Sequence, residues 1–238
     1  MTRRRLFLAP DRIEGGVGRL GPDERHYLAS VLRLEPGAIL EVFDGDGHAW
    51  DASFTGSELA LGERREAPPP AAIVWLAFAL ARGERSDWVV QKATEVGVSR
   101  LVPWQAERSV VRLDRPRAEE RAARWRRIAA EAARQCGRSD VPGVAVPGRL
   151  RDALAAPPGF ARLLFHPGAG APLRASLPAG ALGFLAALGP EGGLTDGEVR
   201  ECLDAGCTRA SLGPRVMRTE TAAVVAAALI QHLAGDLG

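Results

Sequence analysis

Hydrophobic and polar positions alternate through the first part of the chain, a pattern typical of short β-strands joined by turns. The segment AILEVFDGDGHAWDASF (38–54) shows it most clearly, because DGDG (44–47) interrupts two alternating runs. Asp-Gly pairs between such runs favour a β-hairpin. Before it, DERHYLASVLRL (23–34) repeats its hydrophobic residues at helical spacing, and a Pro-Gly pair ends the repeat. Residues 1–66 are therefore predicted to form a small β-rich module with one helix.

A run of prolines separates this module from the rest of the chain. Three consecutive prolines end at Pro70 in the sequence EAPPPAA. Consecutive prolines fit neither a helix interior nor a central strand, because proline lacks the backbone N–H and has a fixed φ. They are typical of a stiff, extended spacer between folding units. The sequence therefore predicts a first domain over residues 1–68 and a second domain over residues 71–238.

Beyond the prolines, hydrophobic runs of strand length alternate with amphipathic runs of helix length. The predicted strands are AIVWLAFAL (72–80), SRLVPWQ (99–105), GFARLLFHP (159–167), ALGFLAALGP (181–190) and CTRASLGP (207–214). The predicted helices occupy 84–97, 117–137, 195–206 and 219–235. This α/β alternation favours a mostly parallel sheet with helices on both faces. Ligands of such sheets bind at the carboxyl ends of the strands.

Polar residues at the starts of three of these helices predict how each helix begins. The candidate caps are Ser86 or Asp87 for the first helix, Thr195 for the third, and Thr219 or Thr221 for the last. Short hydroxyl and carboxylate side chains at these places satisfy free backbone N–H groups. Because Glu198 follows Thr195 by three positions, this pair predicts a capping box.

The composition is that of an ordinary globular protein and excludes few functions. The chain has 238 residues, of which 46% are hydrophobic and 25% charged. No hydrophobic run approaches the roughly 18 to 20 residues that span a bilayer. The N-terminal arginines are followed by too short a hydrophobic run for a signal peptide, so a cytoplasmic protein is expected. The three cysteines lack metal-ligand spacing and are expected to be reduced and buried.

The charge distribution is more informative than the net charge of +2. Residues 108–138 hold ten arginines against four acidic residues, and much of this segment lies in the second predicted helix. Arg124, Arg127, Arg134 and Arg138 can form a cationic face there. Such a face is either a solvated helix surface or a contact for an anionic polymer, and the density of arginine favours the polymer.

Several other patterns look chemical but lack the context that would support them. GVGRLG (16–21) matches a dinucleotide-binding pattern, yet no strong strand precedes it and a proline follows. His26 and His48 have no partners at metal-ligand spacing, so structural roles are favoured and no metal site is expected. His166 differs, because it ends a predicted strand in FHPG and can line a pocket at the sheet edge.

Two segments with the same beginning stand at the ends of predicted strands. They are LGPEGGL (188–194) and LGPRVMRTETA (212–222). The glycines leave backbone groups uncovered, so a flat ring can rest against them. Glu191 and the absence of Lys or Arg in the first segment disfavour a phosphate and favour an adenosine or a cationic ligand. Arg218 lies at the positive end of the last helix, where it gains nothing from the helix dipole, which suggests an external anion.

Together, these segments resemble one known family. QKATEVGV (91–98), RWRRIAAEAARQCGR (124–138) and the two Leu-Gly-Pro segments are similar to the signatures of the bacterial 16S ribosomal RNA uracil-N3-methyltransferases. RRLFL and HYLASVLRL near the N-terminus match the start of that family. The resemblance spans nearly the whole chain. It departs in small ways, with Val96 where Leu is usual and HPG at 166–168 where the family varies.

The resemblance implies a fold, a cofactor and partners that the hydrophobic pattern does not show. The fold would be a SPOUT-type α/β domain with a C-terminal trefoil knot, preceded by a small PUA-like β-barrel that helps to hold RNA. The cofactor would be S-adenosylmethionine. The partners would be the 16S rRNA of the small ribosomal subunit and a second copy of the chain in a homodimer.

The expected site residues follow from the matching segments. The cofactor would contact His166, Leu188, Gly189, Pro190, Glu191, Gly192, Gly193, Leu212, Gly213, Met217, Arg218 and Thr219. The expected RNA contacts are Arg3, Arg4, Arg5, Arg33, Lys92, Arg108, Arg124, Arg127, Arg134 and Arg138.

Methylation at N3 requires the uracil to lose its N3 proton, which places negative charge on the flanking carbonyl oxygens. Arg218 or Arg215 can stabilise that charge. Glu220 or Glu95 can accept the proton; the alternatives are that water accepts it or that the arginine alone suffices. The residues themselves leave other functions open. These are a non-catalytic RNA-binding or ribosome-assembly protein, and a SPOUT methyltransferase acting on a ribose 2′-hydroxyl or another base.

Overall fold

The computed structural model describes residues 4–168, 170–235 and 237–238. The chain forms two compact units. The first consists of Met1–Pro69 together with Ala130–Val141, and the second of Pro70–Ala129 together with Pro142–Gly238. Each unit has its own sheet.

The first unit is built on a six-stranded sheet in the order β1-β4-β5-β6-β3-β2. Its elements are β1 (Arg5–Phe7), the 3-10 helix η1 (Pro10–Arg12), β2 (Ile13–Glu14), β3 (Val17–Arg19), α1 (Pro22–His26), the π-helical turn η2 (Tyr27–Val31), β4 (Ile39–Phe43), β5 (His48–Phe54) and β6 (Glu58–Glu66). The predicted hairpin is the β4–β5 pair, and the predicted helix corresponds to α1 and η2.

Alternation along the strands gives this unit its core. Leu40 and Val42 of β4, Phe54 of β5 and Leu59 of β6 belong to one buried cluster, with Leu28 of η2 against it. Burying one face of each strand in this way is what alternating hydrophobic residues predict.

The turn of the β4–β5 hairpin is held by Asp44. Its Oδ1 accepts hydrogen bonds from the backbone nitrogens of Asp46 (2.8 Å) and His48 (3.1 Å). Its Oδ2 lies 2.6 Å from Nδ1 of His48. His48 therefore has the structural role expected for it.

Residues 130–141 belong to the first unit, although the chain places them far from its other residues. Arg5 Nη1 donates to the carbonyl oxygen of Ala133 (3.1 Å), and Arg134 Nη1 donates to the hydroxyl of Tyr27 (2.8 Å). The sequence predicts this segment as part of the domain over residues 71–238. Its position differs because long-range contacts, which no local pattern shows, hold it to the small sheet.

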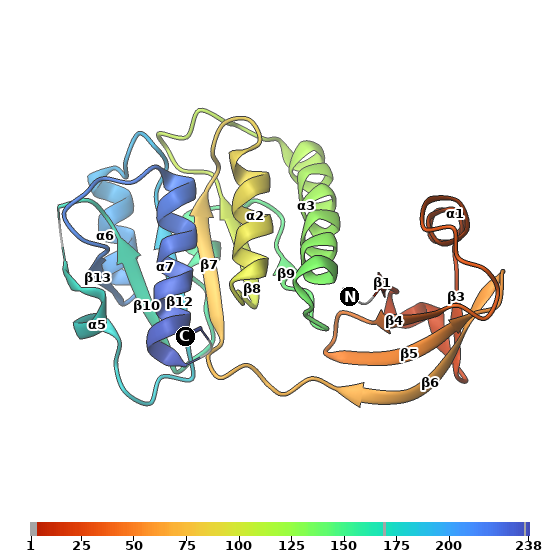
Figure 1. Ribbon diagram of the computed structural model, residues 1–238. Helices are drawn as coiled ribbons and strands as arrows, with labels where there is room; N and C mark the ends of the chain where they lie inside the picture. The colour runs from red at the N-terminus through yellow and green to blue at the C-terminus, as the bar shows by residue number, and fades with distance from the viewer. Residues whose placement is uncertain (1–3, 169, 236) are drawn as a thin grey trace. The chain divides into compact units, whose positions relative to one another are not determined.

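The second unit is built on a seven-stranded sheet in the order β11-β13-β10-β12-β7-β8-β9, in which every pair is parallel (Figure 1). The strands are β7 (Val74–Ala79), β8 (Arg100–Trp104), β9 (Gly143–Val144), β10 (Phe160–Phe165), β11 (Ala171–Pro172), β12 (Gly183–Leu188) and β13 (Cys207–Ser211). The helices are α2 (Arg85–Glu95), α3 (Arg115–Cys136), α4 (Leu150–Ala153), α5 (Leu173–Ser176), α6 (Asp196–Asp204) and α7 (Thr219–Ala234). The expected mostly parallel sheet is confirmed.

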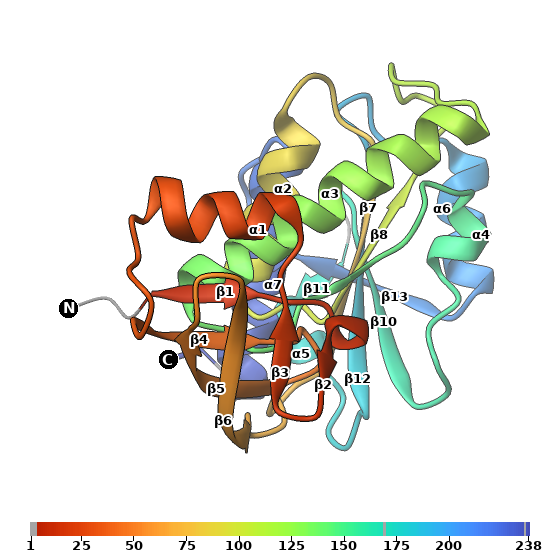
Figure 2. The same cartoon turned by 90° about the vertical axis from the view of Figure 1, so that its right-hand side faces the viewer.

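Helices cover both faces of this sheet. Figure 2 shows α2 and α7 on one side of the strands and α4 and α6 on the other. Along β7 the side chains alternate accordingly: Ala77 and Ala79 join the buried cluster that includes α4 and α6, whereas Phe78 lies against Trp125 of α3. Strands buried on both faces explain the nearly continuous hydrophobic runs in the sequence.

The end of the sheet contains a threaded arrangement. β13 lies between β10 and β11, so the segment from Phe165 to Gly183 passes around β13 before it returns to β12. The approach is close at Gly170, where a Cβ atom would lie 2.7 Å from the backbone of Arg209. After β13 the chain crosses to α7, which packs on β7, β12 and α2.

The predicted helix caps give mixed results. Thr195 and Glu198 form the expected capping box at the start of α6. The predicted caps of α2 and α7 are wrong, because no side chain caps either helix. The Ser86 hydroxyl bonds to Ala81, and Thr219 bonds outside its own helix. Both hydroxyls therefore bond to residues outside the first turn of their own helix.

Other expectations concern the whole chain. All three cysteines are free, but Cys136 is exposed rather than buried, because it lies at the exposed end of α3. Within residues 4–168, 170–235 and 237–238, no helix is long and apolar enough to cross a membrane. The same residues contain no group of three or more His, Cys, Asp or Glu side chains that could hold a metal ion.

Candidate functional site

A cavity of about 150 Å³ lies at the carboxyl ends of three neighbouring strands, β12, β10 and β13. Its walls include the last residue of each strand, which is Leu188, Phe165 or Ser211. The remaining walls come from both Leu-Gly-Pro segments and from the first turn of α7. We call it the glycine-loop cavity. It occupies the edge of the sheet where ligands of parallel α/β folds bind.

The two Leu-Gly-Pro segments face each other across this cavity. The hydroxyl of Thr219, within the second segment, donates to the carbonyl oxygen of Gly189 in the first (3.1 Å). Gly213 has φ +108°, a backbone conformation that side chains rarely adopt. Its N–H donates to the Ser211 hydroxyl (3.1 Å). The repeated tripeptide therefore forms two opposed turns that present main chain to one space.

Most residues expected to contact the cofactor line the glycine-loop cavity. They are His166, Leu188, Gly189, Pro190, Glu191, Gly193, Leu212, Gly213, Met217 and Thr219. Two lie elsewhere. A Cβ on Gly192 would lie 3.2 Å from Cβ of Arg108, and Arg218 lines a neighbouring cavity.

Sequence reasoning missed part of the lining. Phe165, Pro167, Gly168, Ala210, Ser211, Pro214, Val216 and Ala222 also face the cavity. Most of these residues lie within the quoted FHPG and LGPRVMRTETA segments, and Ala210 and Ser211 lie at the end of β13. Only their position at or near the ends of predicted strands could have indicated that they line the cavity.

The chemistry of this lining suits a ligand with a flat, uncharged ring and a cationic group. The walls combine aliphatic side chains with exposed backbone, and Glu191 and Arg215 are the charged side chains among the lining residues. Glu191 Oε1 accepts a hydrogen bond from Arg85 Nη1 (2.8 Å). Backbone groups can pair with an adenine edge, and the carboxylate is compatible with a sulfonium.

A second cavity lies beside the first and has a different character. It is lined by Arg82, Gly83, Glu84, Arg85, Trp88, Arg218, Glu220 and Thr221, and has a volume of about 670 Å³. We call it the Arg218 cavity. It brings together the loop after β7 and the start of α7, two segments that are distant in the chain.

Arg85 connects the two cavities and was not anticipated. Its Nη1 donates to Glu191 of the glycine-loop cavity, and its Nε lies 3.7 Å from Glu220 Oε1 of the Arg218 cavity. The available signal was weak: Arg85 follows the carboxyl end of β7, at the edge of the sheet where the site lies. A single arginine between two carboxylates can fix the position of the Glu191 loop relative to the start of α7.

Glu220 is the carboxylate of interest in the Arg218 cavity. Its side chain is only 14% exposed, and its Oε2 is buried without a hydrogen-bond partner in the described part of the chain. Burying a carboxylate oxygen without a hydrogen-bond donor destabilises the fold, so its presence indicates a functional role for this oxygen. Glu95, the other proposed proton acceptor, instead accepts from Lys92 Nζ (2.8 Å) and lines neither cavity.

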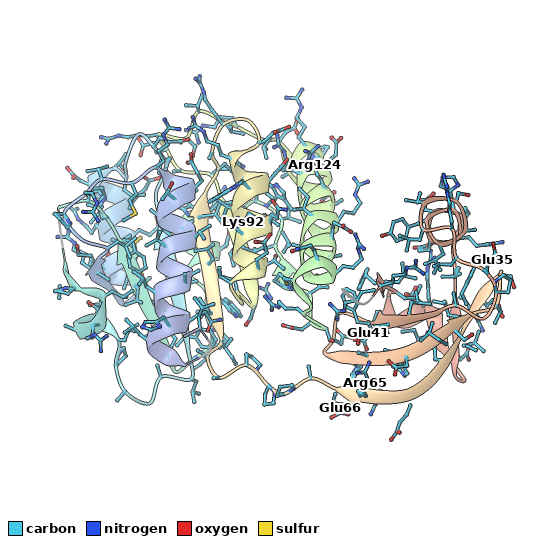
Figure 3. The ribbon with its side chains drawn as sticks, in the orientation of Figure 1. Glu35, Glu41, Arg65, Glu66, Lys92 and Arg124 are labelled. Atoms are coloured by element: carbon cyan, nitrogen blue, oxygen red, sulfur yellow. The ribbon has the colours of Figure 1, made fainter. Side chains whose placement is uncertain are left out.

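Several predicted RNA-contacting residues have protein partners. Figure 3 labels Lys92 on α2 and Arg124 on α3. Arg124 Nη2 donates to Asp87 (2.6 Å), while Arg108 Nη1 donates to the carbonyl oxygen of Leu194 (3.3 Å). Arg134 pairs with Glu131, and Arg138 with Asp140 (2.5 Å). These cations help to hold the fold as well as adding positive charge.

The predicted arginines near the N-terminus differ from one another. Arg5 is buried, with Nε 2.6 Å from Glu41 Oε1, so its guanidinium is a structural group of the first unit. Arg4, Arg33 and Arg127 of α3 are exposed. Arg3 lies outside the described residues.

A third hollow extends along α3 in the second unit. It is lined by Gly83, Glu84, Asp87, Leu113, Arg117, Glu120, Arg121, Arg124, Arg127 and Ile128. We call it the α3 groove. It shares Gly83 and Glu84 with the Arg218 cavity. The arginine-rich helix therefore borders the candidate site through the loop after β7.

The chain is similar to known proteins over nearly its full length. Residues 68–231 match the RNA methyltransferase domain, and residues 20–58 match the RNA methyltransferase PUA domain. The ribosomal RNA small subunit methyltransferase E of Synechocystis is 36% identical over 96% of this chain and 77% of its own length. That of Bacillus subtilis is 32% identical over 88% of each chain.

Solved structures agree with these similarities. A ribosomal RNA small subunit methyltransferase E of Neisseria gonorrhoeae bound to S-adenosyl methionine has a TM-score of 0.86 at 30% identity, covering 97% of this chain and 98% of its own. A methyltransferase of Legionella pneumophila in complex with SAM has a TM-score of 0.85 at 30% identity, covering 98% of both chains. The expected SPOUT-type α/β domain with a PUA-like N-terminal domain is confirmed. The chain therefore belongs to the RNA methyltransferase family, among the ribosomal RNA small subunit methyltransferases E.

Proposed function

We propose that this protein transfers a methyl group from S-adenosylmethionine to N3 of one uridine in the 16S rRNA of the small ribosomal subunit. One observation carries the proposal: two opposed glycine turns, joined by the Thr219–Gly189 hydrogen bond, enclose a cavity at the carboxyl edge of a parallel sheet. Relatives of this chain are named for methylation of small-subunit rRNA, and two similar structures contain the cofactor.

The glycine-loop cavity is the proposed cofactor site. The main chain around Gly189 and Gly213 would pair with the adenine, and the aliphatic side chains of Leu188 and Leu212 would cover its faces. Glu191 would lie on the side of the sulfonium, where a carboxylate is attractive rather than repulsive. When bound, S-adenosylmethionine supplies an electrophilic methyl group. The chain contributes orientation, which accounts for much of the rate in reactions between positioned groups.

The Arg218 cavity is the proposed place for the uracil. N3 lies on the Watson–Crick edge, so the base must be unpaired or turned out of a helix to reach it. Glu220, with its free buried oxygen, would accept the N3 proton. Arg218 would stabilise the negative charge that then develops on the adjacent carbonyl oxygens. Arg215 would act from the cofactor side, because it lines the other cavity.

The remaining partners are proposed from exposed charge and from the resemblance. Arg4, Arg33 and Arg127 are exposed and would contact phosphates, so affinity for RNA should fall steeply with salt. The domain over 1–68 would hold RNA, and the domain over 71–238 would carry out the transfer. The protein would act in the cytoplasm as a homodimer.

The test is to incubate the protein with radiolabelled S-adenosylmethionine and small subunits that lack the modification, and then to map the labelled nucleotide. The proposal predicts label at N3 of a single uridine of 16S rRNA. Label on a ribose 2′-oxygen or on another base would show a different methyltransferase. Binding of RNA without any transfer would show a binding protein. Heat-denatured protein provides the blank.

A further inference from the structure

Trp88 is an exposed aromatic residue in a molecule that buries most of its others. Its side chain on α2 is 42% exposed, whereas Trp104 and Trp125 are each 1% exposed. It lines the Arg218 cavity rather than joining the hydrophobic core. An indole that faces a cavity has an uncovered surface on which a planar ligand can stack.

Most of the charged side chains that line the cavity with Trp88 are cationic. Arg82, Arg85 and Arg218 line the same cavity, together with Glu84 and Glu220. Arg85 is engaged with Glu191. Within the described ranges, neither Arg82 nor Arg218 forms an ion pair, and both are exposed. Two unpaired guanidinium groups beside an exposed aromatic ring suit a nucleotide, which combines a flat base with an anionic phosphate.

The α3 groove provides a route for a nucleic-acid strand to this position. Arg117, Arg121 and Arg124 recur at intervals of four and three residues, so they lie on one face of α3, and all three line the groove. The groove meets the Arg218 cavity at Gly83 and Glu84. A phosphate backbone lying along α3 would therefore arrive beside Arg82 and Trp88.

We infer that Trp88 is the stacking platform for the target uracil, with Arg82 on its phosphate and the flanking strand in the α3 groove. This inference rests on the proposed function and names where the reacting nucleotide binds. Stacking on Trp88 would place the base in the same cavity as Glu220 and Arg218. Trp88 thus acts as a substrate-positioning residue. Glu220 accepts the N3 proton, and Arg218 stabilises the negative charge on the uracil.

The same arrangement accounts for a choice between pyrimidines. Uracil presents an N3–H donor between two carbonyl acceptors, which matches the free Glu220 oxygen and an arginine donor. Cytosine presents an unprotonated N3 acceptor instead, which a carboxylate repels. We expect the cavity to prefer uracil over cytosine for this reason.

The experiment compares Trp88→Ala and Trp88→Phe with the wild-type protein. Leu203→Ala is the matched control, because Leu203 is 40% exposed on α6 and lines neither cavity. Three quantities are measured for each protein. They are the affinity for a short oligouridylate and a matching oligocytidylate, the affinity for S-adenosylmethionine by calorimetry, and kcat and KM with unmodified small subunits.

We expect Trp88→Ala to weaken oligouridylate binding and to raise KM for subunits by about 10-fold, because stacking on an aromatic residue contributes strongly for each base. Trp88→Phe should retain most of the affinity. Neither change should alter the affinity for S-adenosylmethionine, and Leu203→Ala should behave as wild type. Because the chain has five tryptophans, the signal of Trp88 is the part of the fluorescence change that Trp88→Phe lacks. That part should be larger with oligouridylate than with oligocytidylate.

Unchanged oligouridylate affinity and KM in Trp88→Ala would overturn the inference while leaving the methyl transfer intact. A change of Trp88→Ala from dimer to monomer in sedimentation would overturn it too, since Trp88 would then belong to a contact between two copies. If wild-type protein fails to methylate subunits, the proposed function fails. The difference in fluorescence quenching between wild type and Trp88→Phe still decides whether uracil binds at Trp88.

Discussion

The two cavities at the edge of the parallel sheet are neighbours with opposite constructions. The glycine-loop cavity consists largely of main chain and aliphatic side chains from the ends of adjacent strands. The Arg218 cavity consists of charged and aromatic side chains from residues 82–88 and 218–221. A site made of backbone is specified by short contiguous motifs, whereas a site made of side chains is specified by tertiary contacts.

Each construction suits the ligand proposed for it. Main chain would hold a cofactor that is the same in every catalytic cycle, and the conformation of two turns sets the shape of the cavity. Charged side chains can approach and release a large anionic substrate that must be exchanged after each transfer. Arg85 contacts an acidic residue of each cavity, so it is the point at which the two can be coupled.

The largest effect is expected from the backbone of the glycine-loop cavity. Gly213→Val should weaken S-adenosylmethionine binding on the order of 100-fold, because a β-branched residue at φ +108° is strained by a few kcal/mol and would reshape the turn. Calorimetry measures the loss. Gly206→Val is the control, since Gly206 also has positive φ (+82°) and open space around it but lies between α6 and β13. Equal losses in both variants would refute a specific role for the Gly213 turn.

The next effect separates the two cavities. Arg218→Ala should lower kcat on the order of 100-fold, as expected for the loss of a group that stabilises developing charge, with S-adenosylmethionine affinity unchanged. Arg215→Ala should weaken cofactor binding instead, because Arg215 lines the glycine-loop cavity. Single-turnover rates and calorimetry distinguish them. Wild-type transfer by Arg218→Ala would remove the role assigned to Arg218.

A smaller effect is expected at the connection between the cavities. Arg85→Ala should weaken S-adenosylmethionine binding by about 3-fold to 10-fold and lower kcat by a similar factor, because both Glu191 and Glu220 lose a partially exposed ionic partner. Arg85→Lys should recover part of the S-adenosylmethionine affinity and part of kcat. An effect on only one of the two quantities would show that Arg85 serves a single cavity.

The smallest effect lies outside both cavities, in the first unit. Burial raises the pKa of Glu41, but hydrogen bonds from Arg5 and Arg65 outweigh it, so the pKa lies below its ordinary value. Figure 3 shows Glu41 near Arg65, whose Nη2 is 2.8 Å from Glu41 Oε2. A lowered folded-state pKa stabilises the fold above the unfolded-state pKa, and this contribution is lost as the pH falls through the folded-state value.

Glu41→Gln should therefore be less stable than wild type at neutral pH and should lose less stability on acidification. Chemical denaturation at several pH values measures this, and S-adenosylmethionine affinity at neutral pH should not change. Parallel stability curves for the two proteins would contradict the assignment of this acid-sensitive contribution to Glu41.

Local patterns predicted those parts of the fold that depend on neighbours in the chain. The strands, the long helices and the Thr195–Glu198 capping box follow from spacing within a few residues. The same reasoning failed for Thr219, since Gly189 competes for its hydroxyl, and for Asp87, which pairs with Arg124 and Trp125. The passage of β13 between β10 and β11 is equally non-local, so only the resemblance to a known family suggested a knot.

The candidate site divides in the same way. Leu188, Gly189, Leu212 and Gly213 could be named because they stand in short motifs at strand ends. Arg85 and Trp88 could not, because nothing near them in the chain marks the approach of α7. The sequence predicts an RNA contact at Arg5, whereas the structure buries this residue against Glu41 and Ala133.

Hydrogen exchange with each ligand in turn tests the division between the two cavities most directly. S-adenosylmethionine should slow amide exchange in 188–194 and 212–217 and leave 82–88 largely unchanged. Oligouridylate should slow exchange in 82–88 and at the start of α7 instead. Protection of the same segments by both ligands, or no protection of the two glycine turns by S-adenosylmethionine, would contradict this account.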